Sequence, residues 1–251
     1  MRNENKLFKG INGIIINIVE YKDNDLIVTF LTRELGFIQT IVKGAQKKGN
    51  KSFYLISLFN ELTFDVVNYQ KNELSIFKSG DIINACDYTT LSLDNLNMMM
   101  LISEILYKMR NSDIVDNKDF FKLVKYVMRI IVDNNNDSWY YLNYLLLVVL
   151  NKLGVSLVLD RCIICSKQEK IVAFSNHELG FICQDCLNEF NDDLNTDQQL
   201  LSYLYNLNKH LLVRKDEINN KLVFRMLINY LHEKTGILLN SVILLDKGVL
   251  L

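Results

Sequence analysis

The chain has 251 residues, of which 49% are hydrophobic and 23% are charged, and its formal net charge is −1. These values are ordinary for a globular protein of one or two domains. They exclude a chain that is attracted to nucleic acid or membrane by its overall charge. The most apolar stretch, residues 140–154, contains Asn143 and Asn151 and is too short to span a bilayer, so we expect no membrane partner.

The first ten residues, MRNENKLFKG, lack the apolar segment of a secretory signal, so we expect a cytoplasmic protein. In that reducing compartment, paired cysteines usually bind metal instead of forming disulfides. The chain has no proline. The ends of helices and strands are therefore indicated by Gly, Asn, Asp and Ser.

The first 80 residues have the pattern of a small β-domain. Runs rich in β-branched and aromatic residues alternate with short turns. The predicted strands are residues 11–21, 25–32, 36–44, 57–69 and 73–80. Because closure removes the open edges of a sheet, we predict that these five strands form a closed or partly open barrel over residues 1–80.

From about residue 92 the hydrophobic period is that of helices. The predicted helices are residues 92–110, 119–133, 137–154, 196–212 and 219–236. The first starts at a good N-cap, Ser92 or Asp94, and the fourth starts with Thr196 and Gln199 at the spacing of a capping box.

The helix over 137–154 is apolar almost all round, so we expect it to be buried. The second predicted domain is therefore helical and spans residues 81–251. A cysteine segment at about 160–188 interrupts it. The sequence thus predicts a multidomain α+β protein.

Four of the five cysteines, Cys162, Cys165, Cys183 and Cys186, have the spacing C-x2-C-x17-C-x2-C. This spacing is typical of a structural zinc site with four thiolate ligands. The linker over 170–182 has the pattern strand, turn, strand, which would return the second pair to the first. We predict one structural Zn²⁺ per chain.

Other uses of these sulfurs are less favoured by the pattern. Iron fits the same four-sulfur cage. A redox pair would need a thioredoxin-like βαβ setting, which is absent here. A catalytic zinc site would need an open position, and His177 is better explained as a solvated loop residue than as a ligand. Cys86 is flanked by apolar residues and indicates packing.

The N-terminal region holds a concentration of positive charge. Residues 1–52 contain nine Lys/Arg and five Asp/Glu, whereas the rest of the chain contains 19 and 24. Lys43, Lys47, Lys48 and Lys51 lie in one connection between strands, with Phe37, Phe53 and Tyr54 nearby as stacking candidates. Such a loop suits a phosphate backbone, although a solvated lysine loop gives the same pattern.

A second basic feature lies on the predicted helix over 119–133 and just before it. Lys118, Lys122, Lys125 and Arg129 are spaced by four, three and four residues, so they would form one stripe along a helix. Such a stripe could bind phosphate or an acidic peptide, but an ordinary solvated helix face is the better explanation of the pattern.

No enzyme motif accompanies these features. The sequence contains no phosphate-binding G-x-x-x-x-G-K-[ST], no dinucleotide-binding G-x-G-x-x-G after a strand and no H-E-x-x-H. The three histidines are scattered along the chain. We therefore expect no catalytic residues and no small-molecule substrate.

The chain resembles the RecO family of bacterial recombination mediators. The resemblance is carried by DLIVTFLTRELGFIQTIVKGAQKKGNKS, by LGVSLVLDRCIIC followed by FSNHELGFICQDC, and by LINYLHEKTGILLNSVILL. Two residues depart from the pattern. Leu157 stands where the family often has Pro, and Ser166 stands where Gly often follows the first cysteine pair.

The resemblance implies an N-terminal OB-fold barrel and an all-α domain with an inserted four-cysteine zinc element. It also implies a nucleoid-associated role in DNA repair and recombination. Such a protein binds single- and double-stranded DNA, anneals complementary strands and helps load the recombinase onto coated single strands. The implied partners are RecR and the acidic C-terminal tail of the single-stranded-DNA-binding protein that coats the strands.

Carried to matching positions, the DNA-binding residues are Arg33, Lys43, Gln46, Lys47, Lys48 and Lys51. The zinc ligands are the four paired cysteines. We assign the basic stripe to the partner tail. The alternative function is a zinc-ribbon scaffold or regulator that binds protein partners without DNA.

Overall fold

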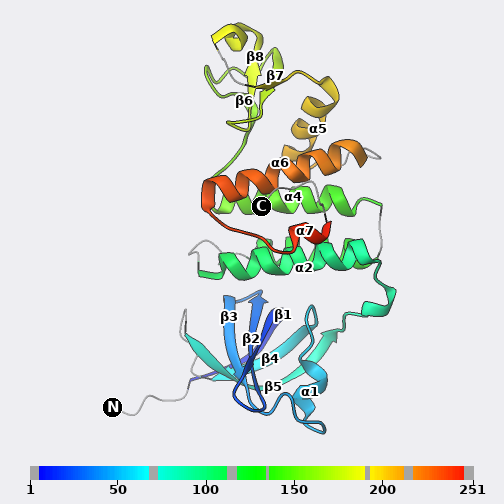
Figure 1. The fold of residues 1–251 in the computed structure, drawn as a ribbon. Helices are drawn as coiled ribbons and strands as arrows, with labels where there is room; N and C mark the ends of the chain where they lie inside the picture. The colour runs from blue at the N-terminus through cyan, green and yellow to red at the C-terminus, as the bar shows by residue number, and fades with distance from the viewer. Residues whose placement is uncertain are drawn as a thin grey trace. The chain divides into compact units, whose positions relative to one another are not determined.

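The computed structural model describes residues 6–67, 73–111, 118–133, 136–189, 193–211 and 217–245. The chain divides into two compact units, a first unit over 1–132 and a second unit over 133–251. Figure 1 shows the elements of both, and each unit is described by itself.

The first unit begins with the five-stranded sheet that the sequence predicts. Its strands are β1 (Leu7–Tyr21), β2 (Asp25–Thr32), β3 (Gly36–Val42), β4 (Glu61–Val67) and β5 (Leu74–Asn84). They are joined in the order β1-β2-β3-β5-β4 and the sheet closes on itself (Figure 1). All pairs are antiparallel except β3 and β5.

Alternating side chains fill the interior of this closed sheet. On β3, every second residue from Gly36 to Val42 is buried. Phe30 and Phe64 stack with their ring centroids 4.3 Å apart, and Phe64 stacks on Phe77 at 5.9 Å. Buried aromatic pairs of this kind contribute more than their area alone.

The register gives the sheet two distinct ends. Leu26 pairs with Val42 near one end of the β2–β3 hairpin, and Thr32 pairs with Gly36 at the other. We call the first the loop end, because it carries the β1–β2 turn at 22–24 and the loop at 43–50. We call the second the turn end, because it carries the β2–β3 turn at 33–35.

A short helix, α1 (Lys51–Leu55), follows the loop and was not predicted. Asn50 is its N-cap, and the Asn50 side chain accepts a hydrogen bond from the Ser52 N–H. The same side chain donates to the backbone carbonyl of Gly44 at 3.0 Å. One residue therefore starts the helix and closes the loop.

Two helices complete the first unit: α2 (Leu93–Lys108) and α3 (Lys118–Val132). The Ser92 hydroxyl caps α2 by accepting from the Asn95 N–H, which confirms one of the two predicted caps. The Asn95 amide donates to the Ile131 carbonyl on α3, and the Ser103 hydroxyl donates to the Ile16 carbonyl on β1. Short 3₁₀ turns cover Tyr88–Thr90 and Met109–Asn111.

These contacts explain why the first unit is longer than the predicted first domain. A boundary at residue 80 falls inside β5, which runs to Asn84. Because α2 and α3 pack with the sheet, the compact unit extends to Val132. The domain boundary at residue 80 stays a prediction from the sequence.

The second unit contains the helices α4 (Ser138–Lys152), α5 (Gln198–Asn208), α6 (Glu217–Thr235) and α7 (Val242–Leu245). As predicted, α4 is largely buried. Its Asn143 amide donates to the Tyr203 hydroxyl and to the Asn220 carbonyl in the core. The N-cap predicted for α5 was wrong, because Asp197 and not Thr196 accepts from the Gln199 N–H.

The cysteine segment forms a four-stranded sheet within the second unit. Its strands are β6 (Val158–Cys162), β7 (Ile171–Ser175), β8 (Gly180–Cys183) and β9 (Leu194–Asn195), in the order β6-β8-β7-β9. The predicted strand, turn and strand correspond to β7 and β8, which pair antiparallel. A 3₁₀ helix covers Gln184–Glu189.

None of the helices in the described part of the chain combines the length and the apolar character that a membrane span requires.

Candidate metal centre and nucleic-acid interface

The sheet of the second unit brings the four paired cysteines together. The Sγ atoms of Cys162, Cys165, Cys183 and Cys186 all lie within 4.8 Å of one another. Cys165 and Cys183 bring their sulfurs to 3.5 Å. Four bonds of about 2.3 Å to one tetrahedral Zn²⁺ would hold the sulfurs about 3.8 Å apart. The cluster therefore has the size of a zinc site.

The backbone around the first cysteine pair forms a tight turn. The Ser166 N–H donates to the Cys162 carbonyl at 3.0 Å, and the Cys162 N–H donates to the Lys167 carbonyl at 2.7 Å. The Lys167 ammonium pairs with the Asp185 carboxylate at 2.7 Å, which links the two turns. This pair lowers the pKa of Asp185.

The electrostatics favour a thiolate at one position. Burial acts to raise the pKa of Cys162, but backbone N–H groups, including those of Cys165 and Cys183, donate to its sulfur. The net effect lowers its pKa to about 6. Burial and the neighbouring sulfurs raise the pKa of Cys186. The two thiols thus have pKa values shifted in opposite directions. A divalent cation would bind all four sulfurs as thiolates and release their protons.

The sulfurs also form the centre of a small core. Cys162, Cys183 and Cys186 are buried together with Ala173 and Ile182. Cys165 is exposed on the outer side. Because the four sulfurs lie at the centre of this cluster, the donor set fits a metal that completes the small core.

The structure places the predicted lysine loop at the loop end of the first unit. The Gly44 N–H donates to the Asp25 carboxylate at 2.8 Å, and the Gln46 N–H donates to the Asn24 carbonyl at 3.1 Å. The side chains of Lys43, Lys47 and Lys48 are exposed. Among the described residues, no carboxylate lies within 4 Å of these three ammonium groups. Lys51 differs, because it pairs with Asp81 at 2.8 Å.

The structure does not bring Arg33 to this loop. Arg33 is exposed in the β2–β3 turn, and its backbone N–H donates to the Asn12 carbonyl. The lysine loop follows the other end of the hairpin, about 20 Å away along β2. A short segment of DNA bound at the lysine loop would therefore not reach Arg33.

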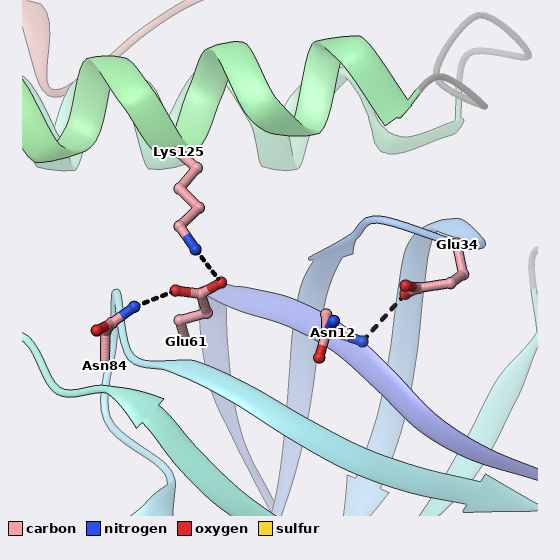
Figure 2. Close-up of polar contacts among 5 residues, drawn as sticks. All are labelled: Asn12, Glu34, Glu61, Asn84 and Lys125. Atoms are coloured by element: carbon pink, nitrogen blue, oxygen red, sulfur yellow. Dashed lines mark hydrogen bonds and ion pairs between the residues drawn. The ribbon is translucent and has the colours of Figure 1, made fainter.

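The basic stripe on α3 is divided by its contacts. Lys125 donates to the Glu61 carboxylate at 2.6 Å, and the Asn84 amide donates to the other oxygen of Glu61 at 2.5 Å. Figure 2 shows Glu61 between these two partners. The Glu61 side chain is 8% exposed and that of Lys125 is 42% exposed. Lys125 is thus committed to a buried carboxylate within the first unit.

The other members of the stripe lie on the outside of α3. Lys118, Lys122 and Arg129 are exposed, and Lys122 pairs with Asp119 at 3.0 Å. The predicted continuous stripe therefore consists of three exposed cations and one cation that is tied to the sheet.

Figure 2 also shows a separate polar contact of the β2–β3 turn, in which the Glu34 carboxylate accepts a hydrogen bond from the Asn12 N–H at 3.0 Å.

A cavity of about 410 Å³ opens beside the ion pair of Lys125 and Glu61 in the first unit. Its polar lining includes Glu61, Asn84, Lys125 and Arg129, and its apolar lining includes Ile14, Phe59, Met99, Met128 and Val132. Cys86 also lines it, and burial followed by the nearby Asp87 carboxylate raises the pKa of that thiol. The sequence did not predict this cavity, because no motif around Glu61 distinguishes it from other charged residues in strands.

Two family models match the chain. The model described as "Recombination protein O N terminal" matches residues 9–86, and that described as "Recombination protein O C terminal" matches residues 91–241. The second match covers more than half of the chain. The chain belongs to the RecO family. This confirms the resemblance carried by the sequence motifs.

Curated members of the RecO family are similar to the chain over most of its length, and each is named DNA repair protein RecO. The Mesoplasma florum protein is 26% identical over 236 residues, which is 90% of this chain and 86% of the relative. The Mycoplasma capricolum protein is 24% identical over 246 residues, or 95% and 97%. An Exiguobacterium protein is 23% identical over 248 residues, or 97% of both.

One departure from the RecO pattern has a physical reading. Ser166 stands where Gly often follows the first cysteine pair, and its φ is +61°. Only glycine adopts this left-handed region without steric cost. The turn that holds Cys162 and Cys165 thus keeps its shape with a serine in a position that suits glycine.

Proposed function

We propose that this RecO-family protein is a DNA repair and recombination mediator. In this proposal it binds single- and double-stranded DNA without sequence preference and anneals complementary strands. It also helps load the recombinase onto strands coated by the single-stranded-DNA-binding protein. RecR and that coating protein are the proposed partners, and the nucleoid is the proposed place of action. No bond-making chemistry is assigned to the chain.

The observation that carries the proposal is the exposed lysine loop on a small closed sheet. A mediator has to act on any strand, so its contacts go to phosphates, which carry no sequence information. Lys43, Lys47 and Lys48 present three ammonium groups on one loop whose backbone is held by Asp25 and Asn50. The order of the five strands supports the OB-fold implied by the resemblance, since this fold is a five-stranded barrel.

We propose a structural role for the metal. In this reading Cys162, Cys165, Cys183 and Cys186 hold one Zn²⁺, which stabilises the small sheet β6–β9. Four thiolates leave no open position for a substrate. The zinc would therefore shape a surface and not take part in a reaction.

The partner tail is assigned to the exposed part of α3. Arg129 lines the cavity together with Met128 and Val132, so positive charge and apolar surface lie together. An acidic tail with apolar residues would match both. We expect Arg129→Glu to slow annealing of strands coated by the single-stranded-DNA-binding protein several-fold while bare strands anneal as before. Equal slowing of bare and coated strands would contradict this assignment.

The lysine loop gives the sharpest test of DNA binding. Each phosphate contact that is lost should lower the slope of log affinity against log salt by about one. We expect the double variant Lys47→Ala, Lys48→Ala to bind DNA more weakly and to show a slope lower by about two. The measurement is fluorescence anisotropy with a labelled oligonucleotide at several salt concentrations.

Lys209→Ala is the matched control, because Lys209 is an exposed cation of the second unit and is not among the predicted DNA-binding residues. It should leave the slope unchanged. An unchanged slope in the lysine double variant would remove the loop from the DNA-binding surface. The alternative function, a zinc-ribbon scaffold for protein partners, predicts no salt-dependent DNA binding by the parent protein.

A further inference from the structure

An aromatic pair lies directly beside the lysine loop. Phe53 and Tyr54 occupy α1, and their ring centroids are 5.3 Å apart with the planes at 83°. Phe53 is 40% exposed and Tyr54 is 68% exposed, which makes Tyr54 the most exposed aromatic side chain in the described part of the chain. In this edge-to-face arrangement each ring keeps a face that its partner does not cover.

The loop and the aromatic pair are held together by backbone contacts. The Phe53 N–H donates to the Asn50 carbonyl, and the Asn50 N–H donates to the Lys47 carbonyl at 3.1 Å. The Asn50 side chain closes the loop on Gly44. Lys47 and the two rings therefore belong to one folded segment, in which their spacing is set by the backbone.

A further cation and ring flank this segment at the loop end. The Lys22 ammonium lies 5.0 Å from the centre of the Tyr21 ring in the β1–β2 turn. That turn is tied to the loop by the hydrogen bond from the Gln46 N–H to the Asn24 carbonyl. A second cation and a further ring thus belong to the same end of the sheet as the lysine loop.

We infer that Phe53 and Tyr54 form a stacking site for unpaired nucleobases, so that the lysine loop prefers single-stranded to double-stranded DNA. This inference rests on the DNA binding proposed for the loop. Lysines contact the phosphates of a single strand and of a duplex alike. A base is available to stack on a protein ring only when it is not stacked inside a duplex. The aromatic pair therefore adds affinity for single strands alone.

The test separates the contribution of bases from that of phosphates. Three probes of equal length are compared: a 12-mer of thymidine, a 12-mer of abasic tetrahydrofuran units and a 12-base-pair duplex. Stacking contributes about fivefold or more in affinity per base. The parent protein should therefore bind the thymidine probe at least about fivefold more tightly than the abasic probe.

We expect Tyr54→Leu to lower affinity for the thymidine probe by about fivefold or more. Affinity for the abasic probe, affinity for the duplex and the salt slope should not change, because the lysines remain. Phe53→Leu should act in the same direction. Tyr205→Leu is the matched control, since Tyr205 is 47% exposed and has Lys209 over its ring at 5.9 Å, but lies on α5 of the second unit.

Two results would overturn the inference, and they differ in what else they remove. Equal binding of the thymidine and abasic probes by the parent protein would remove the stacking site and leave phosphate binding intact. If no probe, the abasic one included, bound in a salt-dependent way, the proposed DNA-binding function would fail together with the stacking site.

Discussion

Replacement of Cys183 by serine is expected to release the metal and to unfold the sheet β6–β9. Cys183 is buried at the end of β8, with its sulfur 3.5 Å from that of Cys165. Metal binding contributes about 10–16 kcal/mol to the folding of small zinc domains. The other buried members of the cluster around the sulfurs are Ala173 and Ile182, with Ile163, Ile171, Leu187 and Leu194 partly buried against it. We expect this small core not to compensate for that loss.

The measurement is the zinc content of the purified protein, by elemental analysis, together with limited proteolysis. The parent protein should hold about one Zn²⁺ per chain, and the variant should hold none and be cleaved between residues 160 and 190. Cys86→Ser is the matched control, because Cys86 lies in the first unit and should leave metal content and cleavage unchanged. A parent protein that is folded and metal-free would contradict the zinc assignment.

Removal of the Lys125 ammonium is expected to destabilise the first unit by about 2 kcal/mol. Lys125→Ala leaves the Glu61 carboxylate buried, with the Asn84 amide as its one remaining side-chain partner in the part of the chain that the structure describes. An orphaned buried charge costs about 3–5 kcal/mol when both partners are buried. The smaller value applies because the Lys125 side chain is 42% exposed.

Urea unfolding of the parent and variants measures this effect. The double variant Glu61→Gln, Lys125→Met should recover most of the lost stability, since it removes both charges and keeps an amide beside Asn84. Lys122→Ala is the control on the same helix. Its pair with Asp119 is exposed on both sides, so it should change stability by less than about 0.5 kcal/mol. Equal effects of Lys125→Ala and Lys122→Ala would show that Glu61 is not held as described.

The sequence predicted the features that follow from local pattern. Alternation of apolar residues predicted the five strands of the first unit, and cysteine spacing predicted the cluster at 162–186, because both depend on residues close in the chain. The apolar character of α4 predicted its burial. The cap of α5 was misplaced by one residue, since Thr196 and Asp197 are both good caps and only the backbone decides between them.

Features that depend on pairing between distant residues were not predictable. Lys125 has the spacing of a solvated stripe, but its partner Glu61 is 64 residues away. Helix periodicity shows which residues share a face and does not show what that face meets.

The measurement that tests the central claim most directly is annealing of two complementary labelled oligonucleotides, bare and coated with the single-stranded-DNA-binding protein, at two salt concentrations. The mediator function predicts faster annealing that is weakened by salt and that survives the coating. The Lys47→Ala, Lys48→Ala variant should lose most of the acceleration. If the parent protein accelerated neither bare nor coated strands, the mediator function would be contradicted and a zinc-stabilised scaffold would be the better account.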